Sequence, residues 1–123
     1  MRYVYKTRTF ARWSRKAGLG DAALRLAIEE MAAGLIDADL GGRVYKKRVP
    51  LPGTGKRGGA RTLIGTDLGD RWFFLFGFGK NERDNIDAHE LAALQAVARA
   101  LLELKPRQLE QAVKAGELVE VEI

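Results

Sequence analysis

The spacing of apolar residues divides the chain into a helical N-terminal part and a central part that is rich in strands. Residues 3–5 have the apolar content of a short strand, and apolar side chains then recur at helical spacing until Gly18 offers a stop. Asp21 is a good N-cap residue, and it predicts the start of a second helix that ends near Gly34. We therefore expect two short consecutive helices after the first strand.

The central part of the sequence predicts three antiparallel strands. Residues 44–49 make the first strand, which Pro50 ends, and residues 62–66 make the second, after a glycine-rich loop. Residues 72–78 are apolar at nearly every position, so both faces of this third strand are expected to be buried. It is predicted to lie at the centre of the sheet.

A long helix and a tail complete the pattern. Asp87, with Glu90 three residues later, predicts a capping box, and leucines at helical spacing follow it. Pro106 begins a last short helix. Residues 119–123 alternate apolar residues with glutamates, which predicts an edge strand whose charges discourage aggregation. The alternative is that this acidic tail lies beside a cationic sheet.

The order of these elements predicts an α+β fold, with a small antiparallel sheet on which two N-terminal helices and a C-terminal helix pack. The length of 123 residues is that of one ordinary domain. Residues 1–123 are therefore expected to form a single domain, in which residues 105–123 are a C-terminal extension of helix and strand.

The composition bounds the class of protein. Its apolar fraction of 46% and charged fraction of 30% are typical of soluble globular proteins, and no apolar run approaches the roughly 20 residues of a membrane helix. Residues 1–10 do not resemble a secretion signal. The sequence has no cysteine, which excludes disulfides and thiolate metal ligands. A reducing cytoplasm is the expected compartment, and no membrane is an expected partner.

Positive charge is concentrated in two stretches of the sequence. The formal net charge is +5, and most acidic residues lie outside these stretches. The first stretch runs from Arg2 to Lys16, and the second holds Arg43, Lys46, Lys47, Arg48, Lys56, Arg57 and Arg61. A polyanionic partner such as a nucleic acid is the leading interpretation of this clustering. The alternative is that the excess charge only aids solubility.

Several kinds of catalytic site are poorly supported. Lys56 is followed by Arg57 instead of Ser or Thr, and a strand follows instead of a helix, so this is not a nucleotide-binding phosphate loop. The lone His89 cannot make a two-histidine acid and base pair, and zinc has no cysteine ligand. Asp87 and Glu90 are explained by helix capping. We expect neither a metal nor another cofactor.

A set of lysines and arginines with Asn81 and nearby aromatic residues remains. Guanidinium groups bind phosphate and can hold the extra charge of a pentacovalent phosphoryl transition state. Crowded cations favour the neutral form of a lysine, which moves its pKa towards a value useful for proton transfer. Cleavage of RNA through its own 2′-hydroxyl needs little else, although a basic binding surface without chemistry uses the same residue types.

The order of motifs resembles that of the RelE/ParE toxin superfamily, especially its RelE and HigB-like branch. The resemblance is carried by "GKRGGARTLI", an aromatic strand, and "FGFGKNERDNI" leading into "HELAALQAVA", and it covers about residues 3–104. It implies a bacterial toxin of a type II toxin and antitoxin pair, with a microbial-ribonuclease-like sheet flanked by helices. Members similar to this chain enter the ribosomal A site and cut messenger RNA, and a cognate antitoxin blocks them.

The resemblance also implies site residues. Lys56, Arg57 and Arg61 stand where this branch keeps cations near the RNA backbone, and Lys80, Asn81 and Arg83 stand at the end of the aromatic strand. The predicted catalytic residues are Lys56, Arg61, Lys80 and Arg83, and the predicted RNA-binding residues are Arg57, Asn81, Lys46, Lys47 and Arg48. In the working assignment the two arginines stabilise phosphate charge, Lys56 or Lys80 transfers protons, and Asn81 orients the nucleotide.

Two other functions fit the same sequence. A sister branch of the superfamily poisons DNA gyrase and is not a nuclease. A plain nucleic-acid-binding module would bind RNA with a steep dependence on salt and would not cut it. The sequence alone leaves these alternatives open.

Overall fold

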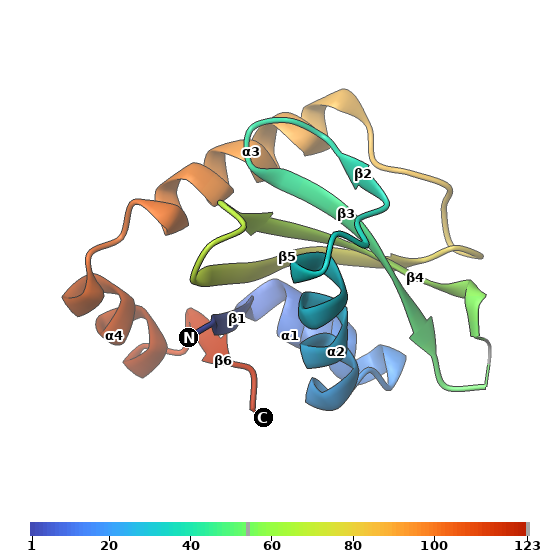
Figure 1. Ribbon diagram of the computed structural model, residues 1–123, viewed down its shortest axis with the longest axis horizontal. Coiled ribbons are helices and arrows are strands. Elements are labelled where there is room, and N and C mark those ends of the chain that lie inside the picture. The colour runs from blue at the N-terminus through green and yellow to red at the C-terminus, as the bar shows by residue number, and fades with distance from the viewer. Residues whose placement is uncertain (54, 123) are drawn as a thin grey trace.

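Ten elements of secondary structure are present in the computed structural model, which describes residues 1–53 and 55–122 and, for residues 55–57, the backbone alone (Figure 1). In chain order they are β1 (Tyr3–Thr7), α1 (Arg8–Ala17), α2 (Asp21–Ala32), β2 (Ala38–Asp39), β3 (Val44–Leu51), β4 (Gly55–Thr66), β5 (Arg71–Gly79), α3 (Ala88–Leu102), α4 (Pro106–Lys114) and β6 (Leu118–Glu120). The predicted α+β class is confirmed. Within the described ranges, no helix has both the length and the apolar character needed to cross a membrane.

The strands form one six-stranded sheet in the order β2-β3-β4-β5-β1-β6. Neighbouring strands are antiparallel except β1 and β5, which are parallel. The sheet is therefore mixed, and the prediction of an antiparallel sheet is correct only for its β2 to β5 part and for the β1 and β6 pair. The long connection through α1 and α2 accounts for the difference, because parallel strands need a crossover and cannot be joined by a tight turn.

Helices cover both faces of the sheet (Figure 1). One face packs on α1 and α2 around a core that includes Phe10, Leu24, Ile64 and Phe74. The other face packs on α3 and α4 around a second core with Leu63, Phe73, Leu75, Phe78, Ala98 and Leu109. β5 contributes to both cores, and it lies between β4 and β1. The prediction of a central strand that is buried on both sides is confirmed.

The starts of α1 and α2 are stabilised in different ways. Thr7 is the N-cap of α1, and its hydroxyl accepts a hydrogen bond from Phe10 N at 3.2 Å. Asp21 was predicted to be the N-cap of α2, but the N-cap is Gly20 and Asp21 is the first helical residue. The carboxylate of Asp21 instead accepts hydrogen bonds from Lys6 Nζ and from Glu122 N. The sequence prediction was wrong here because these partners are distant in sequence.

The hairpin of β3 and β4 is longer than predicted. β3 continues through Pro50 to Leu51, with a shift of register between Val49 and Leu51. A bulge of this kind accommodates proline, which cannot donate to the ladder. β4 begins at Gly55, so residues 55–61 belong to a strand and the expected glycine-rich loop is a strand over most of its length.

The C-terminal third agrees with the predicted elements. Asp87 and Glu90 form the predicted capping box at the start of α3, and Pro106 occupies the first turn of α4. Gly65 of β4 allows α3 to lie close to the sheet. A Cβ at this position would come within 2.9 Å of the Ala98 Cβ. β6 pairs with β1 only, so it is an edge strand as predicted.

Candidate functional site

Three of the predicted cations lie on the sheet face that α3 covers in part. In the register of the strands Arg48 lies opposite Arg61, and Arg61 lies opposite Phe78. Lys46 lies opposite Leu63 and, by strand alternation, on the same face. Phe78 and Leu63 belong to the α3-side core. Lys46, Arg48 and Arg61 therefore form a row at the border of that core, which we call the cationic row.

Arg61 is the most deeply buried member of the cationic row, with a relative exposure of 7%. Its Nη1 lies 3.5 Å from the carbonyl oxygen of Ala60, which is a long contact. Within the described part of the chain, no carboxylate forms an ion pair with this guanidinium. A buried charge without a counter-ion is costly. A guanidinium in this position can bind an anion.

The other two members of the cationic row are more accessible. Arg48 has an exposed side chain, and its Nε lies 3.7 Å from Asp37 Oδ1, so this ion pair is loose. The same Asp37 carboxylate accepts the Arg48 backbone N–H at 2.7 Å. Lys46 is part-exposed, and no ion pair involving its ammonium is present among the described residues. Both cations can contact a polyanion from solvent.

Lys80 and Asn81 lie where β5 ends, beside the start of β4. Lys80 N donates a hydrogen bond to the Gly59 carbonyl at 3.1 Å, so strand pairing continues to this point. Lys80 is the first residue after β5. The side chains of Lys80 and Asn81 are exposed. Glu82 fixes the turn, because its Oε1 accepts the Gly79 N–H at 2.8 Å.

Arg83 is held by the start of α3. Its Nη1 donates to Glu90 Oε2 at 2.8 Å, its Nη2 donates to Glu90 Oε1, and its Nε donates to the Asn85 carbonyl at 3.0 Å. The guanidinium lies 5.6 Å from the ring centroid of Phe78. The hydrogen bonds from Arg83 lower the pKa of Glu90, and those to Glu90 raise the pKa of Arg83. Arg83 was predicted to be catalytic, but its three nitrogens already have protein partners.

Lys47 lies on the opposite face of the sheet. Its partner across the strands is Thr62, and its ammonium is 2.9 Å from Glu30 Oε1 and donates to the Leu35 carbonyl at 2.9 Å. The residue is only 4% exposed. The expectation that Lys47 contacts RNA is therefore corrected, because α2 buries this cation and neutralises it.

The remaining predicted residues are Lys56 and Arg57. Both belong to β4, but their side chains lie outside the described residues. His89 is exposed in the first turn of α3. Among the residues described, no group of three or more histidine and carboxylate side chains could hold a metal ion.

The sequence did not reveal two structural partners of the site. Glu90 was explained as a capping residue only, yet it also binds Arg83. Phe78 lies between the Arg61 position and the Arg83 guanidinium. Simple alternation along β5 would not have placed Phe78 beside the cations, because a shift of register against β4 puts both Leu75 and Phe76 on the α3 side.

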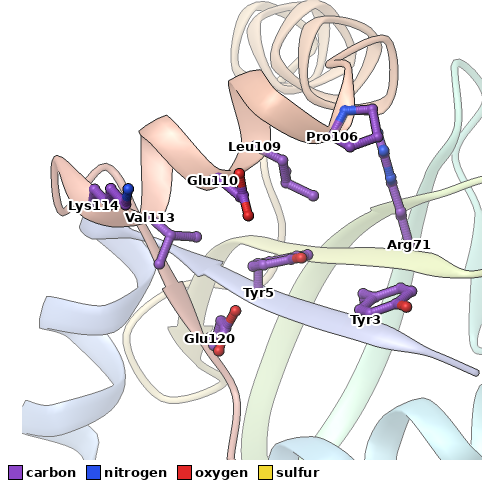
Figure 2. Close-up of a pocket in the computed structure, with 9 residues that line it drawn as sticks. All are labelled: Tyr3, Tyr5, Arg71, Pro106, Leu109, Glu110, Val113, Lys114 and Glu120. Carbon is purple, nitrogen blue, oxygen red and sulfur yellow. The ribbon is translucent and has the colours of Figure 1, made fainter.

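A pocket lies on another part of the molecule, between α4, β1 and β6 (Figure 2). Its volume is about 500 Å³, and Tyr3, Tyr5, Arg71, Leu109 and Val113 are among the residues that line it. Arg71 is the first residue of β5, whereas Phe78 is near its end. None of the predicted site residues lines this pocket, so it belongs to a different surface from the cationic row.

The fold and one comparison define the class of protein. A six-stranded mixed sheet with helices on both faces is consistent with a RelE-like toxin. A family model described as the RelE toxin of the RelE / RelB toxin-antitoxin system matches residues 1–121. The chain belongs to this RelE toxin family, which makes it a toxin with a cognate antitoxin as its partner. A search of curated proteins returned no match.

The family match also corrects one boundary. The resemblance was expected to stop at residue 104, with residues 105–123 as an extension outside it. The match instead continues to residue 121, so α4 and β6 lie within the family's domain.

Proposed function

We propose that this toxin is a ribosome-dependent messenger-RNA endonuclease that acts in the cytoplasm at the ribosomal A site and needs no metal. The proposal is supported by the cationic row, above all by Arg61, which is 7% exposed and has no carboxylate partner among the described residues. An RNA phosphate supplies the missing negative charge. The cognate antitoxin would act by preventing this contact.

Cleavage through the 2′-hydroxyl of the RNA suits such a site. The 2′-oxygen attacks phosphorus, the bond to the 5′-oxygen of the next nucleotide breaks, and a cyclic phosphate remains. Arg61 stabilises the charge on the phosphoryl oxygens. Lys56 or Lys80 takes the proton from the 2′-hydroxyl or returns one to the 5′-oxygen.

The other predicted residues have supporting roles in this proposal. Asn81 orients the nucleotide, and Lys46, Arg48 and Arg57 bind the RNA backbone. Arg83 is proposed to position residues 80–86 against α3, because Glu90 and Asn85 already occupy its guanidinium. This replaces the earlier expectation that Arg83 binds the phosphate.

Primer extension on a defined message tests the proposal. The purified toxin is added to the naked transcript and to the same transcript on translating ribosomes. We expect new 5′ ends only on the translated message, and we expect them to disappear with the Arg61→Gln variant. Arg107→Gln is the matched control, because Arg107 is an exposed arginine in α4.

Three results would contradict the proposal. An intact message on ribosomes that the toxin has stalled would exclude the nuclease. A block of DNA supercoiling by gyrase, with intact messages, would instead identify a gyrase poison. Binding of RNA with neither effect would leave only the binding module.

A further inference from the structure

The edge of β5 next to α1 is not covered by a strand over its second half. β1 pairs with β5 only at residues 71–74, although β5 continues to Gly79. α1 packs across the uncovered part instead. The Thr7 hydroxyl, at the start of α1, donates to the Leu75 carbonyl at 3.3 Å. No strand therefore pairs with the outer edge of β5 at Phe76 and Phe78.

A pocket of about 230 Å³ lies at this edge. Aromatic rings of Trp13, Phe76 and Phe78 line it, together with the charged side chains of Glu82 and Arg83. Phe76 and Phe78 have ring centroids 6.3 Å apart. The pocket is smaller than the roughly 300–1,000 Å³ of sites that bind drug-sized molecules, so it suits a single small ring system.

We call the rings of Trp13, Phe76 and Phe78 the aromatic wall of the pocket. Gly77 allows Trp13 to be part of it. A Cβ on Gly77 would lie 2.4, 2.6 and 2.9 Å from three atoms of the six-membered ring of Trp13. The indole therefore rests directly on the strand backbone, and any larger residue at position 77 would displace it. Trp13 remains part-exposed, although its neighbour Phe10 is fully buried. An accessible indole above a glycine is a surface on which a planar ligand can stack.

Phe78 connects the pocket with the cationic row. Phe78 lines the pocket and lies directly opposite Arg61 in the strand register. The Arg83 guanidinium lines the pocket and lies 5.6 Å from the Phe78 ring centroid. A ligand with a planar ring and an attached phosphate can therefore place its phosphate at Arg61 and its ring against the aromatic wall.

We propose that this pocket at the β5 edge is a base-binding subsite that takes one nucleobase of the RNA while the cationic row holds an adjacent phosphate. The inference rests on the proposed function in its choice of substrate class. Aromatic side chains bind unstacked bases of single-stranded RNA in this way. The Glu82 carboxylate accepts the Gly79 N–H through Oε1, and its other oxygen offers an acceptor to the edge of the base. The subsite thus selects which nucleotide lies beside the scissile bond.

Intrinsic fluorescence tests the subsite without ribosomes and without cleavage. The chain has two tryptophans. Trp72 is fully buried and its Nε1 donates to the Gly69 carbonyl, so a ligand can quench only Trp13 directly. The full chain is titrated with each of the four common ribonucleoside 3′-monophosphates and with ribose 5-phosphate. We expect saturable quenching by at least one nucleotide and none by the sugar phosphate.

Variants make the test specific. Trp13→Phe should abolish the quenching, and Phe76→Leu should weaken binding roughly tenfold, as expected for the loss of one base-stacking ring. Val97→Leu is the matched control, because Val97 is an exposed apolar residue of α3 outside this pocket. Thermal melts verify that all three variants fold.

The outcomes separate the subsite from the nuclease. Equal quenching by ribose 5-phosphate, or no saturable quenching by any nucleotide at the highest soluble concentration, overturns the subsite and leaves the cleavage test unaffected. If nucleotides quench the fluorescence but the toxin cuts no message, the subsite is supported and the proposed nuclease activity is contradicted. If both hold, Phe76→Leu should change the pattern of cleavage positions on a translated message, and an unchanged pattern would overturn the role in selection.

Discussion

Lys47 and Arg61 are two buried cations on neighbouring strands, and their surroundings differ completely. Lys47 lies opposite Thr62, the residue that follows Arg61. The ammonium of Lys47 has a carboxylate from Glu30 at 2.9 Å and the Leu35 carbonyl at the same distance. Arg61 has no carboxylate partner among the described residues, and its Nη1 lies at a long 3.5 Å from the Ala60 carbonyl oxygen.

The comparison indicates that the role of a buried cation depends on whether the helix that covers it supplies a carboxylate. Removing a charge from water costs several kcal/mol unless a partner compensates for it. On one face α2 supplies that partner, so Lys47 contributes to the fold. On the other face, no helix within the described residues forms an ion pair with Arg61, which agrees with the proposed role of Arg61 in binding an RNA phosphate. Four predictions test this contrast.

The largest effect is expected for Arg61→Gln. Removal of a group that stabilises transition-state charge typically lowers a rate by about 100- to 1,000-fold. The free energy of unfolding should stay the same or rise, because an uncompensated buried charge is removed. Primer extension time courses and urea unfolding measure the two quantities. A marked loss of stability with full cleavage activity would reverse the proposed roles of the two cations.

Glu30→Ala should produce the opposite result. It leaves the Lys47 ammonium buried without its carboxylate, and breaking a buried pair in this way costs roughly 3 kcal/mol of unfolding free energy. Cleavage per folded molecule should not change, because Glu30 lies on the α2 side. Urea unfolding provides the measurement, and the exposed neighbour Glu29→Ala is the control. Equal stabilities of the two variants would contradict a structural role for the pair.

The accessible members of the cationic row should have smaller and salt-dependent effects. Lys46→Ala and Arg48→Ala are each expected to weaken binding of a labelled single-stranded RNA and to reduce the slope of log affinity against log salt by about 0.7. Fluorescence anisotropy at several salt concentrations measures both. Arg107→Ala should leave the slope unchanged. A slope that responds equally to all three substitutions would mean that binding is not localised to the row.

The smallest effect concerns the ion pair that holds residues 80–86. Hydrogen bonds from Arg83 and from Asp87 N lower the pKa of Glu90 below its usual value of 4.5. A carboxylate with a lowered folded-state pKa contributes stability above its usual pKa, and this contribution is lost as the pH falls through the lowered value. The wild type should therefore be more stable than Glu90→Gln at neutral pH.

That advantage should shrink as the pH falls below 4.5, when the wild-type carboxylate becomes protonated. Urea unfolding of both proteins across this range measures the difference. Asp21 also has a lowered pKa, because the hydrogen bonds from Lys6 and Glu122 N outweigh its burial. Since Asp21 is present in both proteins, it cancels in the comparison. A constant difference at all pH values would show that Glu90 acts only through its shape.

Local sequence signals predicted the elements that depend on neighbours along the chain. The capping box of Asp87 and Glu90, the proline start of α4 and the apolar central strand were all confirmed. Signals failed where a distant residue competes for the same group. Asp21 has the side chain of an N-cap, but Lys6 and Glu122 bind its carboxylate.

By itself, the sequence determined the α+β class, the family and the set of cations from which a site can be built. It did not show which of Lys46, Lys47 and Arg48 would be buried under a helix and which would be accessible. Strand alternation predicts that consecutive residues lie on opposite faces, but not which face a helix covers. Only the packing of α2 brought Glu30 to Lys47, and only the register of β3, β4 and β5 placed Arg48, Arg61 and Phe78 side by side. These contacts join residues far apart in the chain, so their energies exist only once the sheet and its helices are assembled.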